Sequence, residues 1–283
     1  MTENATFWFG CNVLRHGDII RACIDMLRLV GIEPAPVGGP DYCCGSIKNN
    51  NPLAADGMAK RTVEKMNAKK NARLIAWCPS CYSQMNDIMS NGYRTEFDMD
   101  FLVEVLHERR DQLKQHFVNA IPMTVLVHRH VGFEEKVPVN RMVPDLLSLI
   151  PGMVVVEDDY RAPGYMCNAL AAVPQAMNAM LDRTRELVRE HKVDAIVTVF
   201  HQCYRDLCGL ETQGLCDVFN YIQLLSRSLG IERPDDYKAW KHAGAGASSV
   251  IGEQRIEFMG GTDIYEKLVL PELLKLPGTG RSK

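Results

Sequence analysis

The residues with the clearest capacity for chemistry are cysteines in the first part of the chain. The 283-residue sequence contains ten cysteines. Five of them form a spaced pattern: Cys11, Cys43, Cys44, Cys78 and Cys81. A Cys-x-x-Cys turn places two thiolates at one metal site, and thiolates are soft ligands that select iron–sulfur clusters, zinc or Cu(I). Because five thiolates exceed the four ligands of a structural zinc ion, the pattern indicates a site with more than one metal atom.

Two other interpretations of these cysteines are open. Cys78 and Cys81 can form a redox-active disulfide, and any buried cysteine can act simply as a small apolar residue. The packing interpretation is favoured for Cys23, which lies on the apolar face of an expected helix. Within the Cys-x-x-Cys turn, the amides of Ser80 and Cys81 can point at sulfur and tune a redox potential.

The elements that must position these cysteines follow from apolar runs. Short β-rich runs are expected at 6–9, 73–77, 124–127 and 194–200, and helices at 19–30 and from about Pro174 to His191. The runs at 73–77 and 194–200 lead directly into cysteine-containing segments. In open α/β sheets, ligands gather outside the carboxyl ends of the strands, so separate loops can bring thiolates to one point.

The two halves of the chain use the same order of features. Thr6 aligns with Thr124, Cys44 with Cys167 and Cys81 with Cys203, each pair about 120 residues apart. This near-constant offset predicts an internal duplication with an α/β fold: two pseudo-repeated domains, each a small mostly parallel sheet flanked by helices. The predicted domains are 1–120, 121–230 and a C-terminal extension at 231–283, whose Gly/Ala/Ser-rich stretch at 244–249 is expected to be flexible.

Charge and composition exclude several classes of protein. The formal net charge is −3, and no basic patch indicates a nucleic-acid partner. We find neither a signal-peptide pattern nor the ~18 successive apolar residues of a membrane span. A cytoplasmic location is therefore expected, and in a reducing cytosol dense cysteines favour metal ligands or redox thiols over structural disulfides.

The pattern Cys…Cys-Cys-Gly…Cys-x-x-Cys resembles the cysteine-rich CCG domain of the B-type chain of heterodisulfide reductase and its relatives, over about residues 5–230. The resemblance implies an oxidoreductase acting on sulfur groups, with a noncubane [4Fe-4S] cluster that cleaves or forms a disulfide by stepwise electron transfer. The implied ligands of this cluster are Cys11, Cys43, Cys44, Cys78 and Cys81. Cys43 and Cys44 are the expected catalytic pair, because adjacent ligands among five leave room for substrate sulfur to reach iron.

The second copy departs from this pattern. Only Cys167 and Cys203 remain of the five cysteines, and Met166 and Phe200 replace two others. A second five-cysteine cluster is therefore excluded. Three histidines lie close to the corresponding loops: His128, His130 and His201. Together with the two cysteines they can supply a Cys2His2 zinc site. The alternative is a degenerate structural half in which these histidines are exposed or hydrogen-bonded, with Cys208 and Cys216 as structural residues of a helical segment.

The arrangement of one intact and one degenerate copy resembles that of the second B-type subunit of the heterodisulfide reductase-like complexes of sulfur-oxidising bacteria. The partners this implies are a flavin-containing A-type subunit, an iron–sulfur C-type subunit and a lipoate-bearing or thiol carrier of sulfur. Two other functions are open. The chain can be a non-catalytic scaffold that binds zinc at the first site, or a persulfide carrier that uses Cys78 or Cys81.

Overall fold

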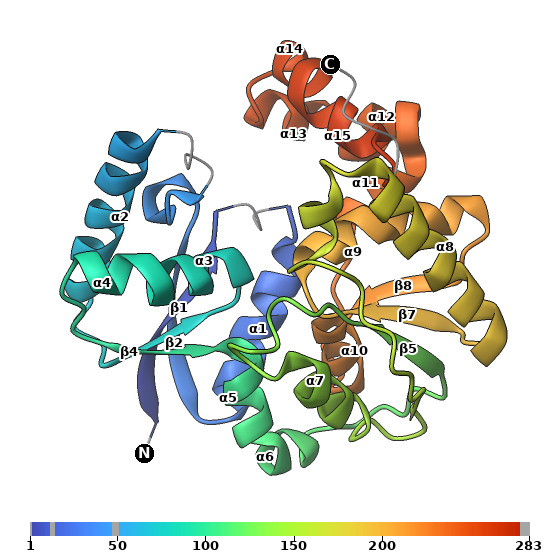
Figure 1. The fold of residues 1–283 in the computed structure, drawn as a ribbon, viewed down its shortest axis with the longest axis horizontal. Coiled ribbons are helices and arrows are strands. Elements are labelled where there is room, and N and C mark those ends of the chain that lie inside the picture. The colour runs from blue at the N-terminus through green and yellow to red at the C-terminus, as the bar shows by residue number, and fades with distance from the viewer. Residues whose placement is uncertain (1, 12–14, 47–50, 278–283) are drawn as a thin grey trace. The chain divides into compact units, whose positions relative to one another are not determined.

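The computed structural model describes residues 2–11, 15–46 and 51–277 and has an α/β fold (Figure 1). The chain divides into two compact units. The first unit comprises Met1–Ile121, Phe133–Pro151 and Ile222–Glu232, and the second comprises Pro122–Gly132, Gly152–Tyr221 and Arg233–Lys283. Each predicted copy, 1–120 and 121–230, contributes one sheet. However, two segments of the second copy group with the first unit, so the compact units are not consecutive in sequence.

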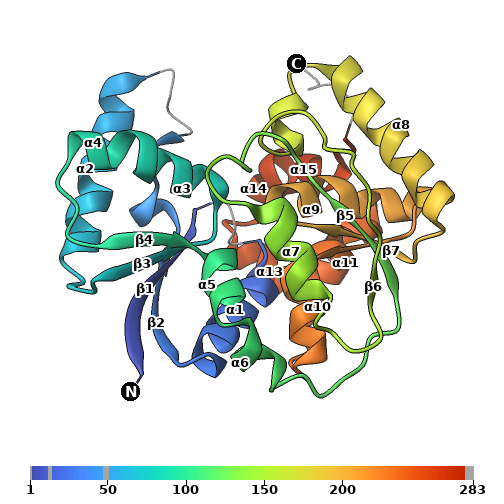
Figure 2. The same ribbon diagram turned by 60° about the horizontal axis from the view of Figure 1, so that its bottom comes forward.

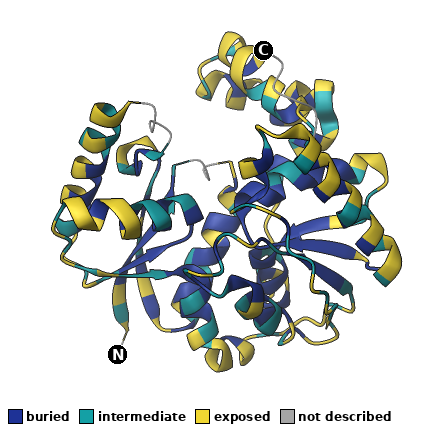
Figure 3. Ribbon diagram, in the orientation of Figure 1, coloured by how far each residue is buried: buried dark blue, intermediate teal, exposed yellow. Residues whose placement is uncertain are grey.

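The first sheet has four parallel strands in the order β2-β1-β3-β4. Their bounds are β1(Glu3–Gly10), β2(Ile32–Gly38), β3(Arg73–Ala76) and β4(Asp98–Phe101). The central strands β1 and β3 are almost fully buried, as expected for a parallel sheet covered on both faces. Figure 3 shows this burial along the strands.

The second sheet is also parallel and repeats the same order, as β6-β5-β7-β8. Its strands are β5(Thr124–His128), β6(Val154–Val155), β7(Ala195–Thr198) and β8(Asp217–Asn220). The first and third strands of each copy are central and pair with each other. The predicted fold of two pseudo-repeated α/β domains is confirmed.

Helices flank the first sheet, and α2, α3 and α4 lie beside one another in both ribbon views (Figures 1 and 2). The helical elements of this unit are α1(Gly17–Leu29), η1(Pro40–Tyr42), α2(Pro52–Asn67), α3(Pro79–Gln84), the π-helical η3(Met85–Met89), α4(Ser90–Gly92), α5(Leu102–Glu108), α6(Arg110–Lys114), α7(Val139–Leu147) and most of α10(Tyr221–Ser228). The predicted helix near 19–30 is α1. It ends before Gly31, whose φ of 80° suits a residue without a Cβ. Cys23 is fully buried on this helix, as expected from its apolar face.

The second unit carries the predicted long helix and a helical C-terminal region. Its elements are η4(Cys167–Leu170), α8(Pro174–His191), α9(His201–Leu207), η5(Cys208–Gln213), α11(Asp236–Ala243), η6(Gly244–Gly246), α12(Ala247–Ile251), α13(Glu253–Phe258), α14(Thr262–Ile264), the π-helical η7(Tyr265–Val269) and α15(Leu270–Leu274). Pro174 occupies the first turn of α8, where its missing N–H costs nothing.

Two expectations for this second unit were wrong. The stretch at 244–249 is not a flexible linker: it forms η6 and the start of α12, because Ala247 and Ile251 are buried and anchor it. Cys216 is not helical, since it lies just before β8 and is only partly buried. Within the described ranges, no helix combines the length and apolar character needed to cross a membrane.

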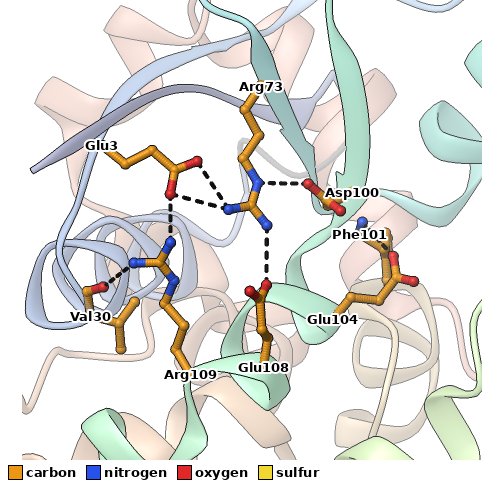
Figure 4. A network of polar contacts seen from close by, with 8 residues as sticks. All are labelled: Glu3, Val30, Arg73, Asp100, Phe101, Glu104, Glu108 and Arg109. Atoms are coloured by element: carbon orange, nitrogen blue, oxygen red, sulfur yellow. Dashed lines mark hydrogen bonds and ion pairs between the residues drawn. The ribbon is translucent and has the colours of Figure 1, made fainter.

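A network of ion pairs holds the strands of the first sheet together at their amino ends (Figure 4). Arg73 at the start of β3 contacts Glu3 at the start of β1 at 3.0 Å and Asp100 of β4 at 2.6 Å. Arg109 pairs with the other oxygen of Glu3 at 2.5 Å and donates a hydrogen bond to the carbonyl of Val30. These ion pairs do not involve the carboxyl ends of β1, β2 and β3, where the cysteine-bearing segments begin.

Candidate metal centres

All five cysteines of the first copy lie at the carboxyl end of the first sheet. Cys11 directly follows β1, and Cys43 and Cys44 follow β2 and η1. Cys78 precedes α3 and Cys81 lies in the first turn of that helix, so both follow β3. The sheet topology therefore delivers three cysteine-bearing segments to one edge, as predicted from the apolar runs.

The five thiols form one connected group. The Sγ atoms of Cys11 and Cys43 lie 3.6 Å apart. Cys43, Cys44, Cys81 and Cys78 lie close enough to shift one another's thiol pKa values, Cys43 with Cys44, Cys44 with Cys81 and Cys81 with Cys78. Four of the five are buried, whereas Cys11 is partly exposed. The group therefore has one side that reaches solvent, at Cys11.

Glycine makes the close approach of β1 to the Cys-x-x-Cys turn possible. Gly10 has a φ of 86°, and a Cβ there would lie 2.9 Å from Cβ of Cys78 and 3.3 Å from Sγ of Cys81. No larger side chain fits this position without displacing the turn. The sequence analysis did not identify Gly10 as a site residue, although a glycine directly before the first ligand was a visible signal.

Hydrogen bonds fix the loop that carries the adjacent pair. The buried hydroxyl of Thr62 in α2 donates to the carbonyl of Cys43 at 2.8 Å, and the indole N–H of Trp8 donates to the carbonyl of Tyr42 at 2.9 Å. The thiol of Cys44 donates to the Ser46 hydroxyl at 3.3 Å. These contacts fix the loop that carries the Cys43 and Cys44 thiols, so the fold itself holds both ligands in place.

The electrostatics of the first site lower the thiol pKa of Cys43 and Cys78 and raise those of the other three cysteines. Contacts with the Cys11 and Cys44 thiols lower the pKa of Cys43, and the backbone N–H of Gly45 adds to this effect against the opposing effect of burial. A hydrogen bond from Cys81 lowers the pKa of Cys78, helped by the amides of Cys81 and Ser80. The expectation that these two amides point at sulfur is confirmed. Five soft donors gathered at one edge of the sheet fit an iron–sulfur cluster better than a single zinc ion.

A second group of ligand atoms lies at the equivalent edge of the second sheet. His128 is the last residue of β5, and His130 follows two residues later. Cys167 begins η4, and Cys203 lies in the first turn of α9. The ligand atoms of these four residues all lie within 4.8 Å of one another, and all four residues are buried. Two of the three predicted histidines thus join the two predicted cysteines.

His201 does not belong to this group. It is the first residue of α9 and is buried, but Cys203 comes only two residues later. Side chains two positions apart on a helix point in different directions, so one helix cannot direct both at the same point. The inclusion of His201 in the predicted second set has no support from the geometry.

The pKa values of the two histidines in the second group shift in opposite directions. Burial, reinforced by the nearby His130, lowers the pKa of His128 far below its ordinary value, so this imidazole is neutral. Burial also lowers the pKa of His130, but the charge and hydrogen bond of Cys203 outweigh it and raise that pKa overall. The pKa of Cys203 is lowered to about 5, since contacts with Cys167 and His130 overcome the opposing effect of burial.

Comparisons with known proteins bear on the first site. Residues 5–86 match a family model described as the cysteine-rich domain CCG. None of the curated proteins matches the chain. One similar solved structure is an aspartate racemase homologue from Pyrococcus horikoshii OT3, with 9% sequence identity, coverage of 81% of this chain and 97% of that chain, and a TM-score of 0.34. A likeness at this level supports no statement about function.

The matched range contains all five converging cysteines of the first copy and the glycine that lets them meet. It ends just after the Cys-x-x-Cys turn and leaves the second copy unmatched. The similarity to the CCG cysteine-rich domain is therefore shown for residues 5–86, which hold the five-cysteine pattern.

Proposed function

We propose that this chain is an iron–sulfur subunit of a heterodisulfide reductase-like complex in the cytoplasm, and that its first site carries disulfide and thiol chemistry. The observation that carries the proposal is the convergence of five thiols, one of them partly exposed, at the carboxyl end of the first sheet. The match of residues 5–86 to the CCG domain supports the same conclusion. The ligands of the proposed noncubane [4Fe-4S] cluster are Cys11, Cys43, Cys44, Cys78 and Cys81.

The bound cluster supplies single-electron steps at a metal that can bind a substrate sulfur. Reduction of a disulfide consumes two electrons and two protons and releases two thiols, and oxidation of sulfur runs in the opposite direction. The protein holds the adjacent Cys43 and Cys44 in a loop fixed through Thr62. Because Cys11 is the partly exposed member of the set, a substrate sulfur approaches from its side. The electrons are exchanged with a flavin-containing A-type subunit and an iron–sulfur C-type subunit, and the sulfur is carried by a lipoate-bearing or thiol partner.

The proposal is tested by comparing Cys44→Ala with Cys23→Ala in the complex isolated from its native host. Cys44 lies in the thiol group, whereas Cys23 is a fully buried cysteine of α1. We expect Cys44→Ala to abolish turnover and reduce the iron content of the assembled complex. Cys23→Ala should leave turnover and iron unchanged and cost about 1–2 kcal/mol of stability.

Other outcomes would favour the alternatives. Full turnover in assembled Cys44→Ala complex would contradict the proposal and support a scaffold. Mass spectrometry that finds a sulfur adduct on Cys78 or Cys81 during turnover, with no iron in the protein, would support a persulfide carrier instead.

A further inference from the structure

Three distances between sulfur and nitrogen atoms at the second site lie between 3.3 and 3.6 Å. Sγ of Cys167 lies 3.3 Å from Nε2 of His128 and 3.6 Å from Nε2 of His130, and Sγ of Cys203 lies 3.4 Å from Nε2 of His130. A tetrahedral zinc ion has Zn–S bonds of ~2.3 Å and Zn–N bonds of ~2.0–2.1 Å, which places its sulfur and nitrogen ligands about 3.5 Å apart. These three sulfur–nitrogen distances match those between the ligands of one tetrahedral ion.

We propose that His128, His130, Cys167 and Cys203 bind one zinc ion in a closed Cys2His2 site. Two thiolates and two imidazoles form a complete structural zinc set, whereas an iron–sulfur cluster prefers thiolates alone. All four residues are buried, with exposed fractions of 5% for His128, 1% for His130 and 0% for both cysteines. Catalytic zinc sites keep one position open to water or substrate, so four buried protein ligands indicate a structural ion.

Contacts around the ligands orient them toward this ion. Nδ1 of His130 lies 3.2 Å from the carbonyl of Pro163, so it carries the proton and donates, and the lone pair of Nε2 faces the sulfurs. The backbone N–H of Cys167 donates to Sγ of Cys203 at 3.4 Å, which stabilises a thiolate there. The rings of His128 and His130 pack edge to face with their centroids 4.9 Å apart, so each can present Nε2 from a different direction.

The position of this site indicates that the ion cross-links three segments of the second copy. It joins the end of β5, the start of η4 and the first turn of α9, which are equivalent to the segments that hold the five cysteines in the first copy. In the second copy, where three of the five cysteines are missing, one ion replaces a cluster as the cross-link between these three segments. The two copies therefore divide their roles between redox chemistry and structure.

X-ray absorption at the zinc edge tests this inference on the full chain, purified without oxygen and without chelators. We expect one zinc per chain with two sulfur ligands at ~2.3 Å and two nitrogen ligands at ~2.0–2.1 Å. Zinc surrounded by sulfur alone would place the metal in the five-cysteine site and overturn the proposal. Folded chain that takes up no zinc when supplied with Zn²⁺ would overturn it as well.

Two variants and a control separate the second site from the first. Cys203→Ser and His130→Ala should lose zinc at least tenfold and keep their iron, because neither residue belongs to the five-cysteine group. Cys208→Ser is the matched control, since Cys208 is buried in the same unit and its thiol donates to the carbonyl of Arg205, at 3.8 Å, outside the four-residue group. Unchanged zinc content in both site variants would contradict the assignment. If these variants do not fold, the ligand set found by absorption in the unaltered chain still decides the question.

Discussion

The Sγ atoms of Cys11 and Cys43 lie 3.6 Å apart, although 32 positions separate the two residues in the sequence. They meet because β1 and β2 are adjacent parallel strands that end side by side, with Gly10 opposite Gly38 after a register shift between Trp8 and Gly10. The N–H of Gly39 donates to the carbonyl of Gly10 at 2.8 Å, which closes the pairing just before both cysteine segments. The geometry of the thiol group is therefore set by strand ends, and small changes there should disrupt it.

Gly10→Ala should remove iron from the first site. A Cβ at this position would lie 2.9 Å from Cβ of Cys78, and the φ of 86° is unfavourable for alanine, by about 1–2 kcal/mol. We expect most of the iron to be lost, as measured by metal analysis of chain purified without oxygen.

Gly92→Ala is the matched control for this change. A Cβ at Gly92 would meet no atom within 4 Å, and the residue lies in α4 away from the strand ends. Equal iron content in Gly10→Ala and Gly92→Ala would show that the close approach at Gly10 does not support metal binding.

Thr62→Val should loosen the Cys43 loop without removing a ligand. The buried hydroxyl donates to the Cys43 carbonyl at 2.8 Å, and deleting the donor costs about 1–3 kcal/mol. Iron should bind but be released faster to a chelator. Thr184→Val removes an equally buried hydrogen bond, to the Met180 carbonyl in α8 of the second unit, and should leave the release rate unchanged. The interpretation fails if both variants release iron at the same rate as the unaltered chain.

Local patterns in the sequence predicted the two central strands of each sheet, helices α1 and α8 and the repeat, but not the outer strands β2, β4, β6 and β8 or helix α2. Apolar runs fix where strands lie, and Gly31 and Pro174 mark helix ends through backbone geometry alone. The five-cysteine set also followed, because parallel strands bring their carboxyl ends to one edge.

Features that depend on tertiary packing were missed or assigned wrongly. The sequence alone did not show that His201 lies outside the second group. That conclusion requires knowing that α9 begins at His201, because the start of the helix sets the directions of the His201 and Cys203 side chains. The stretch at 244–249 has the composition of a flexible linker, yet burial of Ala247 stabilises a helix there. The grouping of 133–151 with the first unit rests on contacts between α5 and α7, which no local pattern reports.

Gly132→Ala should weaken the zinc site without touching a ligand. A Cβ there would lie 3.0 Å from the backbone of Gly164, next to the Pro163 carbonyl that accepts from His130. Displacing a contact of this kind typically lowers metal affinity by about 10–100-fold. Competition with a zinc chelator measures the change, and Gly246→Ala, whose Cβ would meet nothing within 4 Å, is the control. Identical zinc affinities in the two variants would argue against an orienting role for the carbonyl.

Glu3→Gln should change how stability depends on pH. Burial opposes ionisation of Glu3, but its contacts with Arg73 and Arg109 outweigh burial and lower its pKa in the folded state. A lowered folded pKa stabilises the fold above the ordinary pKa of 4.5, and this stabilisation disappears as the pH falls through the lowered value. Unfolding by urea should show the variant about 1 kcal/mol less stable at pH 7, with a smaller difference in acid.

Glu33→Gln serves as the control for this measurement. Glu33 pairs with Arg28 at the surface, where both side chains are about half exposed and the pair is screened by water. Its loss should cost less than that of Glu3 at pH 7. A deficit in Glu3→Gln that stays constant or grows on acidification would rule out the ion pairs as its cause.

Metal analysis combined with EPR on the full chain, isolated without oxygen, tests the central claim most directly. The five converging thiols predict a brown protein with about four iron and four sulfide per chain at the first site and an EPR signal in one oxidation state. Cys44→Ala should lose this signal and keep its zinc. A colourless protein that contains zinc but neither iron nor sulfide would contradict the account.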